Sequence, residues 1–363
     1  MRNLAVFIRW GIFSAFVGLF VGAFSTLFAF CLRQVTSFRT ENPWLILCLP
    51  LAGVVIVFLY GVFRYKNDKG TNMVLSSIHA EAEVPFRMAP LIFISTIITH
   101  LFGGSAGREG AALQLGGSIG QQLGKLFRFD EKDQRIVVMC GMSAAFSAIF
   151  GTPIAASIFS MEVVSVGVMY YAALVPCVFS SLVASKFANH MGIGPNVFKI
   201  RQMPLFEVVP SLKVIGLALC CAALSVVFCM ALHSLGDFYR NKLKNPYIRI
   251  IVSSLVIILL TIILQTDDYM GAGVPVIQRA ILDNAARYVR PGGTLVYSTC
   301  TIDPAENEEQ VRAFVGRHPE FRVVTPDVRF PAGMTVGDWG ALSVPTRTGM
   351  DGFFLCAMQK RDS

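Results

Sequence analysis

The sequence predicts a mainly α-helical, polytopic membrane bundle with broken or re-entrant helices, followed by a small soluble α/β fragment. Of the 363 residues, 54% are hydrophobic and 15% are charged, whereas a soluble protein carries about 25% charged residues. The charges are also unevenly distributed, because residues 282–363 hold 9 Lys/Arg and 10 Asp/Glu while residues 1–281 hold 22 and 13. Finally, several apolar runs are long enough to cross the roughly 30 Å hydrocarbon layer of a bilayer. The lipid bilayer is therefore the expected environment of the first three quarters of the chain.

The first two crossings are predicted at residues 4–32 and 43–63. The first apolar run is too long for a signal peptide, and no A-x-A-like cleavage site closes it. A short helix is expected over residues 70–80, opened by the turn Gly70-Thr-Asn-Met-Val74. A polar turn before a helix inside a membrane protein is typical of a broken or re-entrant helix that lines a cavity.

Later helices are marked by start signals and by further apolar runs. Asp130 is a good N-cap, and Thr152 with Pro153 repeats the pattern of an N-cap followed by proline. Segments 70–80 and 152–166 are shorter than a full crossing, which is typical of transporters that bind ions at half-helix ends. The predicted ranges are 87–102, 109–126, 131–150, 152–166, 170–189, 211–236 and 248–265.

The stretch Gly103–Gly124 carries eight glycines together with Arg108 and Glu109. One interpretation is close helix packing in lipid through small residues spaced four apart, at Gly103/Gly107, Gly116/Gly120 and Gly120/Gly124. The other is an anion site, because a glycine-rich turn that opens a helix presents backbone N–H groups at the positive end of the helix dipole. Packing does not explain two charges at membrane depth, which are costly and usually functional, so the anion site is favoured.

The remaining candidates are weaker. His100 is expected either to hydrogen-bond near a pore or, more commonly, to bond a backbone carbonyl. The nine cysteines contain no C-x-x-C pair, so neither a zinc site nor a disulfide framework is predicted. The net charge of +8 comes from the membrane part, where basic loops fit the positive-inside tendency, so it does not indicate nucleic-acid binding.

The last part of the chain has the pattern of a soluble α/β segment. Asp303, Pro304 and Glu306 form a capping-box arrangement that predicts a helix running to about His318. At about 80 residues the segment is small for an independent domain. The other predicted elements are an amphipathic stretch at Ile281–Val289, a turn at Arg290–Gly293, and strands at Thr294–Thr299, Phe321–Thr325 and Asp351–Met358.

Three blocks in the first part resemble the CLC chloride channel/transporter family: Gly103-Gly-Ser-Ala-Gly-Arg-Glu-Gly110 with Gln114, Gly141–Ile154, and Phe159-Ser-Met-Glu162. The resemblance covers about residues 1–280. It implies that Glu109 is a gating glutamate, whose carboxylate occupies an anion site until it is protonated or displaced. It also implies a homodimer, a chloride-type substrate and no cofactor for transport. The residues it assigns to anion binding are Gly70, Thr71, Asn72, Met73, Gly107, Arg108 and Gly110.

The chain departs from this family at three places. Gly70-Thr-Asn-Met-Val74 replaces the usual Gly-Ser-Gly-Ile-Pro, a variant reminiscent of the fluoride-exporting branch, so fluoride is the alternative anion. Val163 occupies the position of the inner glutamate of the better-known exchangers, which argues against proton coupling by that route. The resemblance stops around Gly271–Ile277, so most of the second inverted half of the family is absent.

The tail resembles RNA cytosine-5 methyltransferases of the RsmB/Sun type, at Arg290–Thr301, Pro304–Glu309 and Gly349–Leu355. The resemblance implies that Cys300 is the nucleophile, although a lone cysteine after a strand is more commonly a buried apolar residue. S-adenosylmethionine would be the cofactor only of a complete domain. No glycine-rich cofactor loop and no acidic-Ala-Pro-Cys segment is visible.

The sequence therefore predicts a chimera of three segments: a partial CLC-type domain at 1–275, a junction at 276–282 and a methyltransferase fragment at 283–363. The favoured function is an anion channel or transporter gated by Glu109. The alternatives are an RNA (rRNA) cytosine-5 methyltransferase, with RNA as its partner, and a nonfunctional fragment. The predicted location is a multi-pass protein of the bacterial plasma membrane with a cytoplasmic tail.

Overall fold

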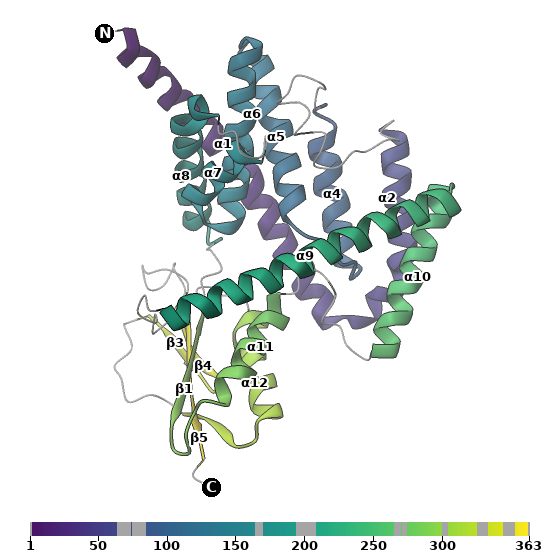
Figure 1. The fold of residues 1–363 in the computed structure, drawn as a ribbon, viewed down its shortest axis with the longest axis vertical. Helices are drawn as coiled ribbons and strands as arrows, with labels where there is room; N and C mark the ends of the chain where they lie inside the picture. Colours follow the sequence, from purple (N-terminus) through teal and green to yellow (C-terminus); the bar gives the residue numbers. More distant parts are fainter. Residues whose placement is uncertain are drawn as a thin grey trace.

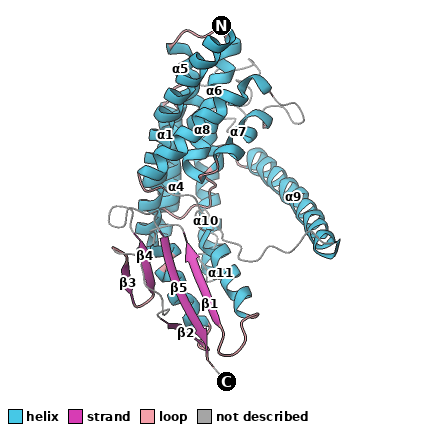
Figure 2. Cartoon of the chain, turned by 90° about the vertical axis from the view of Figure 1, so that its left-hand side faces the viewer, coloured by secondary structure: helices cyan, strands magenta, loops and turns pink. Residues whose placement is uncertain are grey.

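A helical bundle and a small antiparallel sheet make up the computed structural model of the chain (Figure 1). The N-terminus lies at the far end of the bundle and the C-terminus at the far end of the sheet, as the rotated view also shows (Figure 2). The predicted fold class is thus confirmed. The structure describes residues 2–63, 74, 85–163, 170–193, 208–264, 270, 274–299, 304–324, 333–343 and 353–361.

The helices of the bundle follow the predicted order. Among the described residues, five helical segments are long and apolar enough to cross a membrane. The first helix runs nine residues past its predicted end at 32, and the second crossing begins as a 3-10 helix. The predicted helix at 70–80 lies outside the described residues except for Val74. The elements are α1 (Arg2–Glu41), η1 (Pro43–Cys48), α2 (Leu49–Val62), α4 (Met88–Leu101), α5 (Glu109–Leu126), α6 (Glu131–Phe150), α7 (Pro153–Glu162), η2 (Tyr171–Ala173), α8 (Leu174–His190), α9 (Val208–Lys242) and α10 (Pro246–Leu264).

Helices α5 and α6 approach each other so closely that their backbones touch. A β-carbon added at Gly116 would clash with the carbonyl oxygen of Gly141, and one added at Gly120 would lie 2.7 Å from the carbonyl oxygen of Val137. Gly124 continues the same stripe against Gln134. The packing interpretation is therefore confirmed for Gly116 and Gly120, where small residues let the two helix backbones meet without intervening side chains, while Gly124 leaves room for the Gln134 side chain.

Serine side chains tie α6 to α7 and α8 inside the bundle. Ser143 on α6 donates to the Ser157 hydroxyl of α7 over 3.3 Å, and the Ser157 hydroxyl lies 2.8 Å from that of Ser181 on α8. Ser147 on α6 donates to the carbonyl oxygen of Ser181 at 2.8 Å. All four side chains are fully buried. Such hydrogen bonds between helices hold membrane bundles together.

The two predicted N-caps have different outcomes. The carboxylate of Asp130 accepts a 2.8 Å hydrogen bond from the Asp133 amide, which confirms this cap. Thr152 makes no side-chain cap bond, so that prediction was wrong in its chemistry, although α7 does begin at Pro153. The backbone explains the difference, because Asp130 has the extended ψ of 169° while Thr152 has a ψ of 71°. An N-cap side chain reaches the first-turn amides from the extended region.

The tail is a sheet of five antiparallel strands packed against two helices (Figure 2). The strand order is β1-β5-β4-β3, and β2 pairs with the other end of β5. Phe314, Phe321, Phe354 and Met358 form the centre of its core. The bounds are α11 (Val274–Ala286), β1 (Thr294–Thr299), η3 (Pro304–Glu306), α12 (Glu308–Arg317), β2 (Phe321–Val324), β3 (Thr335–Gly337), β4 (Gly340–Ser343) and β5 (Phe353–Lys360).

The tail corrects two local predictions. The helix expected from Pro304 begins later, because Pro304–Glu306 is a separate 3-10 turn and α12 begins only at Glu308. Asp303 lies outside the described residues, so its cap stays a prediction. A hydrogen bond from β1 stabilises this turn, because the Tyr297 hydroxyl donates to the Glu306 carbonyl at 2.6 Å. The amphipathic helix begins at Val274 rather than Ile281, so the whole predicted junction at 276–282 lies inside one continuous helix, α11.

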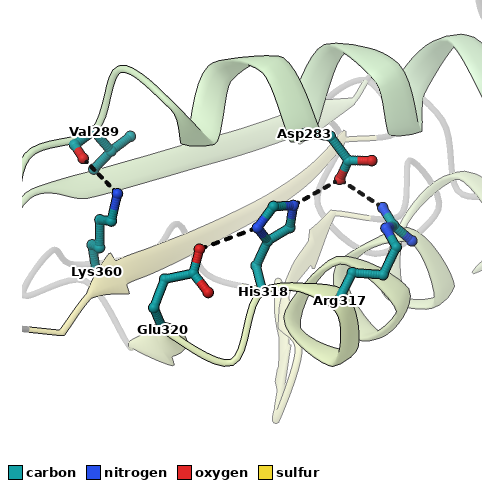
Figure 3. Close-up of polar contacts among 6 residues, drawn as sticks. All are labelled: Asp283, Val289, Arg317, His318, Glu320 and Lys360. Carbon is teal, nitrogen blue, oxygen red and sulfur yellow. Dashed lines mark hydrogen bonds and ion pairs between the residues drawn. The ribbon is translucent and has the colours of Figure 1, made fainter.

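An ionic cluster ties α11 to α12 and β2 on the surface of the tail (Figure 3). Asp283 accepts from Arg317 at 2.9 Å and lies 3.1 Å from His318 Nε2, while Glu320 lies 3.2 Å from His318 Nδ1. Burial alone would raise the pKa of Asp283, but Arg317 and His318 outweigh it and lower the pKa. A hydrogen bond from its own backbone, then His318 and Lys360, lowers the pKa of Glu320.

Substituting Gly116 by alanine should destabilise the bundle. The new methyl group would meet the backbone of Gly141 and the β-carbon of Ala145, and overpacking of this kind costs about 1–3 kcal/mol. Thermal unfolding of the detergent-solubilised chain measures the loss. Gly11→Ala is the control, because no atom lies within 4 Å of its added β-carbon. Equal unfolding midpoints for the two variants would contradict the α5–α6 contact.

The ionic cluster should make the tail less stable in acid. The folded-state pKa values of Asp283 and Glu320 are lowered, so their contribution is complete above the unfolded values of about 4 and is lost as the pH falls through the folded values. Hydrogen exchange of the α11 and α12 amides in the full chain should accelerate over that range. Asp283→Asn should reduce this pH dependence, whereas Asp338→Asn, in the β3–β4 turn, should leave it intact.

Candidate functional site

The candidate site begins where α4 ends and the chain reverses into α5. The Gly104 amide donates to the Thr99 carbonyl at 2.8 Å, and the Gly103 amide donates to the His100 carbonyl at 3.3 Å. Gly103 has a φ of +76°, the left-handed conformation that glycine adopts without strain. These bonds form a Schellman motif, which closes the C-terminus of α4 and turns the chain sharply.

Helix α5 starts without a capping side chain. Arg108 occupies the N-cap position with a helical backbone conformation, and its side chain makes no cap bond. An arginine side chain has no acceptor atom, so it cannot satisfy the first amides of the helix. These amides have no partner within the helix itself, and the dipole makes this end positive. The start of α5 is therefore suited to an anionic partner.

Glu109 is the first residue of α5, and its side chain folds back over the preceding loop. A β-carbon added at Gly107 would lie 2.5 Å from the Oε2 atom of Glu109, so the carboxylate lies directly against the Gly107 backbone. Gly107 and Glu109 are both exposed. Glycine at this position leaves room for the carboxylate beside the N-terminus of its own helix.

Arg108 fixes the loop to the end of α6. Its guanidinium lies over the Phe150 ring, 5.7 Å from the centroid, in a cation–π arrangement. Its side chain is also within electrostatic range of Glu109 and of Glu306 in the tail. The loop thus carries one positive and one negative side chain next to the N-terminus of α5.

The structure brings together one contiguous group of the predicted site residues: Gly107, Arg108, Glu109 and Gly110. Gly70, Thr71, Asn72 and Met73 lie outside the described residues, as does Cys300. Val74, which follows the first of these segments, is fully buried and packs on Gly117 of α5. Val163 caps the C-terminus of α7 and packs against the apolar core.

Two residues near the loop were underrated from sequence. Arg39 belongs to the part of α1 beyond its predicted end, and it donates to the Met270 sulfur at 3.0 Å, beside Gly103. His100 is buried, and among the described residues its Nε2 atom has no hydrogen-bond partner. The expected hydrogen bond from His100 to a backbone carbonyl is therefore not made by Nε2. The only sequence signal for His100 was its position just before the glycine-rich stretch.

The described cysteine of the tail is chemically inert. Cys356 lies on β5 inside the tail core, and burial raises the pKa of its thiol to about 12. A thiol of this kind carries almost no thiolate at neutral pH, and the thiolate is the nucleophilic form. Cys356 does not supply the predicted nucleophile.

Comparison with known proteins identifies the larger part of the chain. The model of the voltage-gated chloride channel family matches residues 52–302, which is more than half of the chain. The chain belongs to this family. A chloride/fluoride channel protein of Pseudomonas syringae is 33% identical over 274 residues, 74% of this chain and 61% of that protein. The chain therefore spans about three fifths of this curated relative.

Solved structures agree with this assignment. The crystal structure of a CLC-type fluoride/proton antiporter superposes with a TM-score of 0.70 at 31% identity, covering 77% of this chain and 70% of that one. A slow cyanobacterial Cl⁻/H⁺ antiporter superposes with a TM-score of 0.58 at 20% identity, covering 69% and 63%, and shares the fold. The predicted CLC membership is thereby confirmed.

The tail has a different similarity. The model of the 16S rRNA methyltransferase RsmB/F family matches residues 264–359. A probable ribosomal RNA small subunit methyltransferase B of Bacillus subtilis is 44% identical over 103 residues, which is 27% of this chain and 22% of that protein. The two family matches overlap over residues 264–302. The predicted domain boundaries at 275 and 283 stay predictions.

The position of the Glu109 carboxylate can be tested at Gly107. In Gly107→Ala the new methyl group would take the space of the carboxylate oxygen, so the flexible side chain should swing away from the loop. Stability should change by no more than about 0.5 kcal/mol, while modification of Glu109 by a carbodiimide, followed by mass spectrometry, should increase. Gly61→Ala, with no atom within 4 Å, should match the wild type. Unchanged Glu109 reactivity in Gly107→Ala would contradict this placement.

Proposed function

We propose that the chain mediates transmembrane permeation of a small halide, with Glu109 as the gate. The observation that carries the proposal is the Glu109 carboxylate at the uncapped start of α5, folded over Gly107. A carboxylate there occupies the position that a permeating anion would take. Protonation or displacement of the carboxylate would free the helix N-terminus for the anion.

Fluoride is the halide that we propose first, with chloride as its competitor. Membership of the family and the names of the relatives support a halide, since one is a chloride/fluoride channel protein and another a fluoride/proton antiporter. The variant turn Gly70-Thr-Asn-Met-Val74 favours fluoride. Val163 occupies the position of the inner glutamate of the better-known exchangers. Permeation that is not coupled to protons through this position is therefore favoured.

The protein's surroundings form part of the same proposal. We place the chain in a bacterial plasma membrane as a homodimer with the tail in the cytoplasm. Support comes from α9, whose membrane-length segment Ser211–Tyr239 has no buried residue and which stands apart from the bundle in the rotated view (Figure 2). An apolar helix exposed on all sides requires lipid or another protein around it.

RNA methylation is not adopted as a second function. The described strand pairs of the tail are all antiparallel. A nucleotide-type cofactor is usually held by a loop between a parallel strand and a helix. Cys300, the predicted nucleophile, lies outside the described residues, so no observed geometry supports the chemistry.

Efflux from fluoride-loaded liposomes tests the proposed gate. Wild-type efflux should be restricted, because the Glu109 carboxylate competes with the anion for the start of α5. Glu109→Ala should be faster at the same pH, because it lacks that carboxylate. Glu131→Ala is the matched control, since Glu131 also begins a helix, but one that Asp130 caps. Wild-type efflux no faster than from empty liposomes, or equal efflux from the wild type and Glu109→Ala, would refute the proposal.

A further inference from the structure

His100 is a buried histidine with an unused ring nitrogen beside the candidate site. It lies in the last turn of α4 and is 2% exposed, and its Nε2 atom has no hydrogen-bond partner among the described residues. Leaving a buried polar atom unpaired costs about 1–3 kcal/mol. Such an atom in a native structure therefore calls for a specific explanation, such as a ligand that the atom binds.

The surroundings of the ring favour a negatively charged ligand. Arg39 lies against Gly103, whose amide donates to the His100 carbonyl, and Arg108 and Glu109 follow this turn at the start of α5. The two guanidinium groups come from different elements, one from the N-cap of α5 and one from α1. The uncapped start of α5 adds the positive end of a helix dipole to the same region. Glu109 is the one carboxylate in this group, and under the proposed function it is the group that moves.

We propose that His100 determines anion specificity by donating a hydrogen bond from Nε2 to the permeating halide near the start of α5. The proposal rests on the proposed function. The imidazole presents an N–H at Nε2 either when protonated or in one neutral tautomer. Fluoride is the smaller and stronger hydrogen-bond acceptor of the two halides, so this donor favours fluoride over chloride.

Two substitutions separate the hydrogen bond from the packing of the ring. His100→Leu removes the N–H and keeps an apolar side chain in the buried site, whereas His100→Gln retains an amide N–H donor. In liposomes loaded with potassium fluoride, His100→Leu should slow efflux by about tenfold, the effect of one hydrogen bond to a charged group. Potassium chloride efflux should fall less, and His100→Gln should recover most of the fluoride rate.

Thermal stability distinguishes a role in anion specificity from a purely structural role of His100, because a structural role predicts a lower unfolding midpoint for His100→Leu. His100→Leu removes an unpaired buried nitrogen, so its thermal unfolding midpoint should equal or exceed that of the wild type. His233→Leu is the control, because His233 is exposed on α9 and its ring bonds the Cys229 carbonyl at 2.8 Å. Its efflux should match the wild type with both halides.

The outcomes distinguish this proposal from the proposed function. If the wild type transports fluoride and His100→Leu transports both halides at the same rates, His100 has no role in specificity and any ligand on Nε2 is a bound water. A lowered unfolding midpoint together with slow efflux would also overturn the proposal. If the wild type shows no efflux, the proposed function fails. Fluoride titration calorimetry then decides, since equal binding by wild type and His100→Leu would overturn the role of His100.

Discussion

The backbone contact between α5 and α6 is the constraint on which the candidate site depends. Gly116 and Gly141 face each other with no side chain between them, and Gly120 and Gly124 extend the contact along the helix. Since even one methyl group would have to displace backbone, the axis of α5 is fixed relative to α6. The start of α5 is fixed with it, together with Arg108 and Glu109. Precise placement of an anion at a helix end requires a helix that cannot shift.

The difference between two neighbouring helix starts explains why the site forms at α5. Helix α6 begins after Asp130, whose own carboxylate accepts from the Asp133 amide and so satisfies the helix end internally. Helix α5 begins after Arg108, which cannot accept a hydrogen bond and whose guanidinium lies over Phe150 instead. The two helices have similar lengths and comparable dipoles. Of these two helix starts, that of α5 is the one without a capping carboxylate, so it is available to a movable carboxylate or a free anion.

Most features governed by local sequence were predicted, with the Thr152 cap and the start of α12 as exceptions. The apolar runs, Asp130 and the glycine-rich start of α5 each depend on neighbouring residues, and the structure has α4, α5 and α6 within one residue of the predicted bounds. Long-range contacts were not predictable. Arg39 meets Met270 across 231 positions of sequence. The short strands β3 and β4 pair with each other, and β4 also pairs with β5. The unpaired Nε2 of His100 is likewise a property of its surroundings, which no pattern of spacing records.

Helix α11 joins the two unlike parts of the chain. Helix α11 contains the predicted junction, yet both of its halves contact the tail: Gln278 donates to Glu306 at 3.2 Å, and Asp283 bonds Arg317 and His318. Leu282, between them, is buried in the tail core. By its contacts, α11 is part of the tail from Gln278 onward. Glu306, bonded by Gln278 through its side chain and by Tyr297 through its carbonyl, thus connects α11 and β1 to the turn before α12.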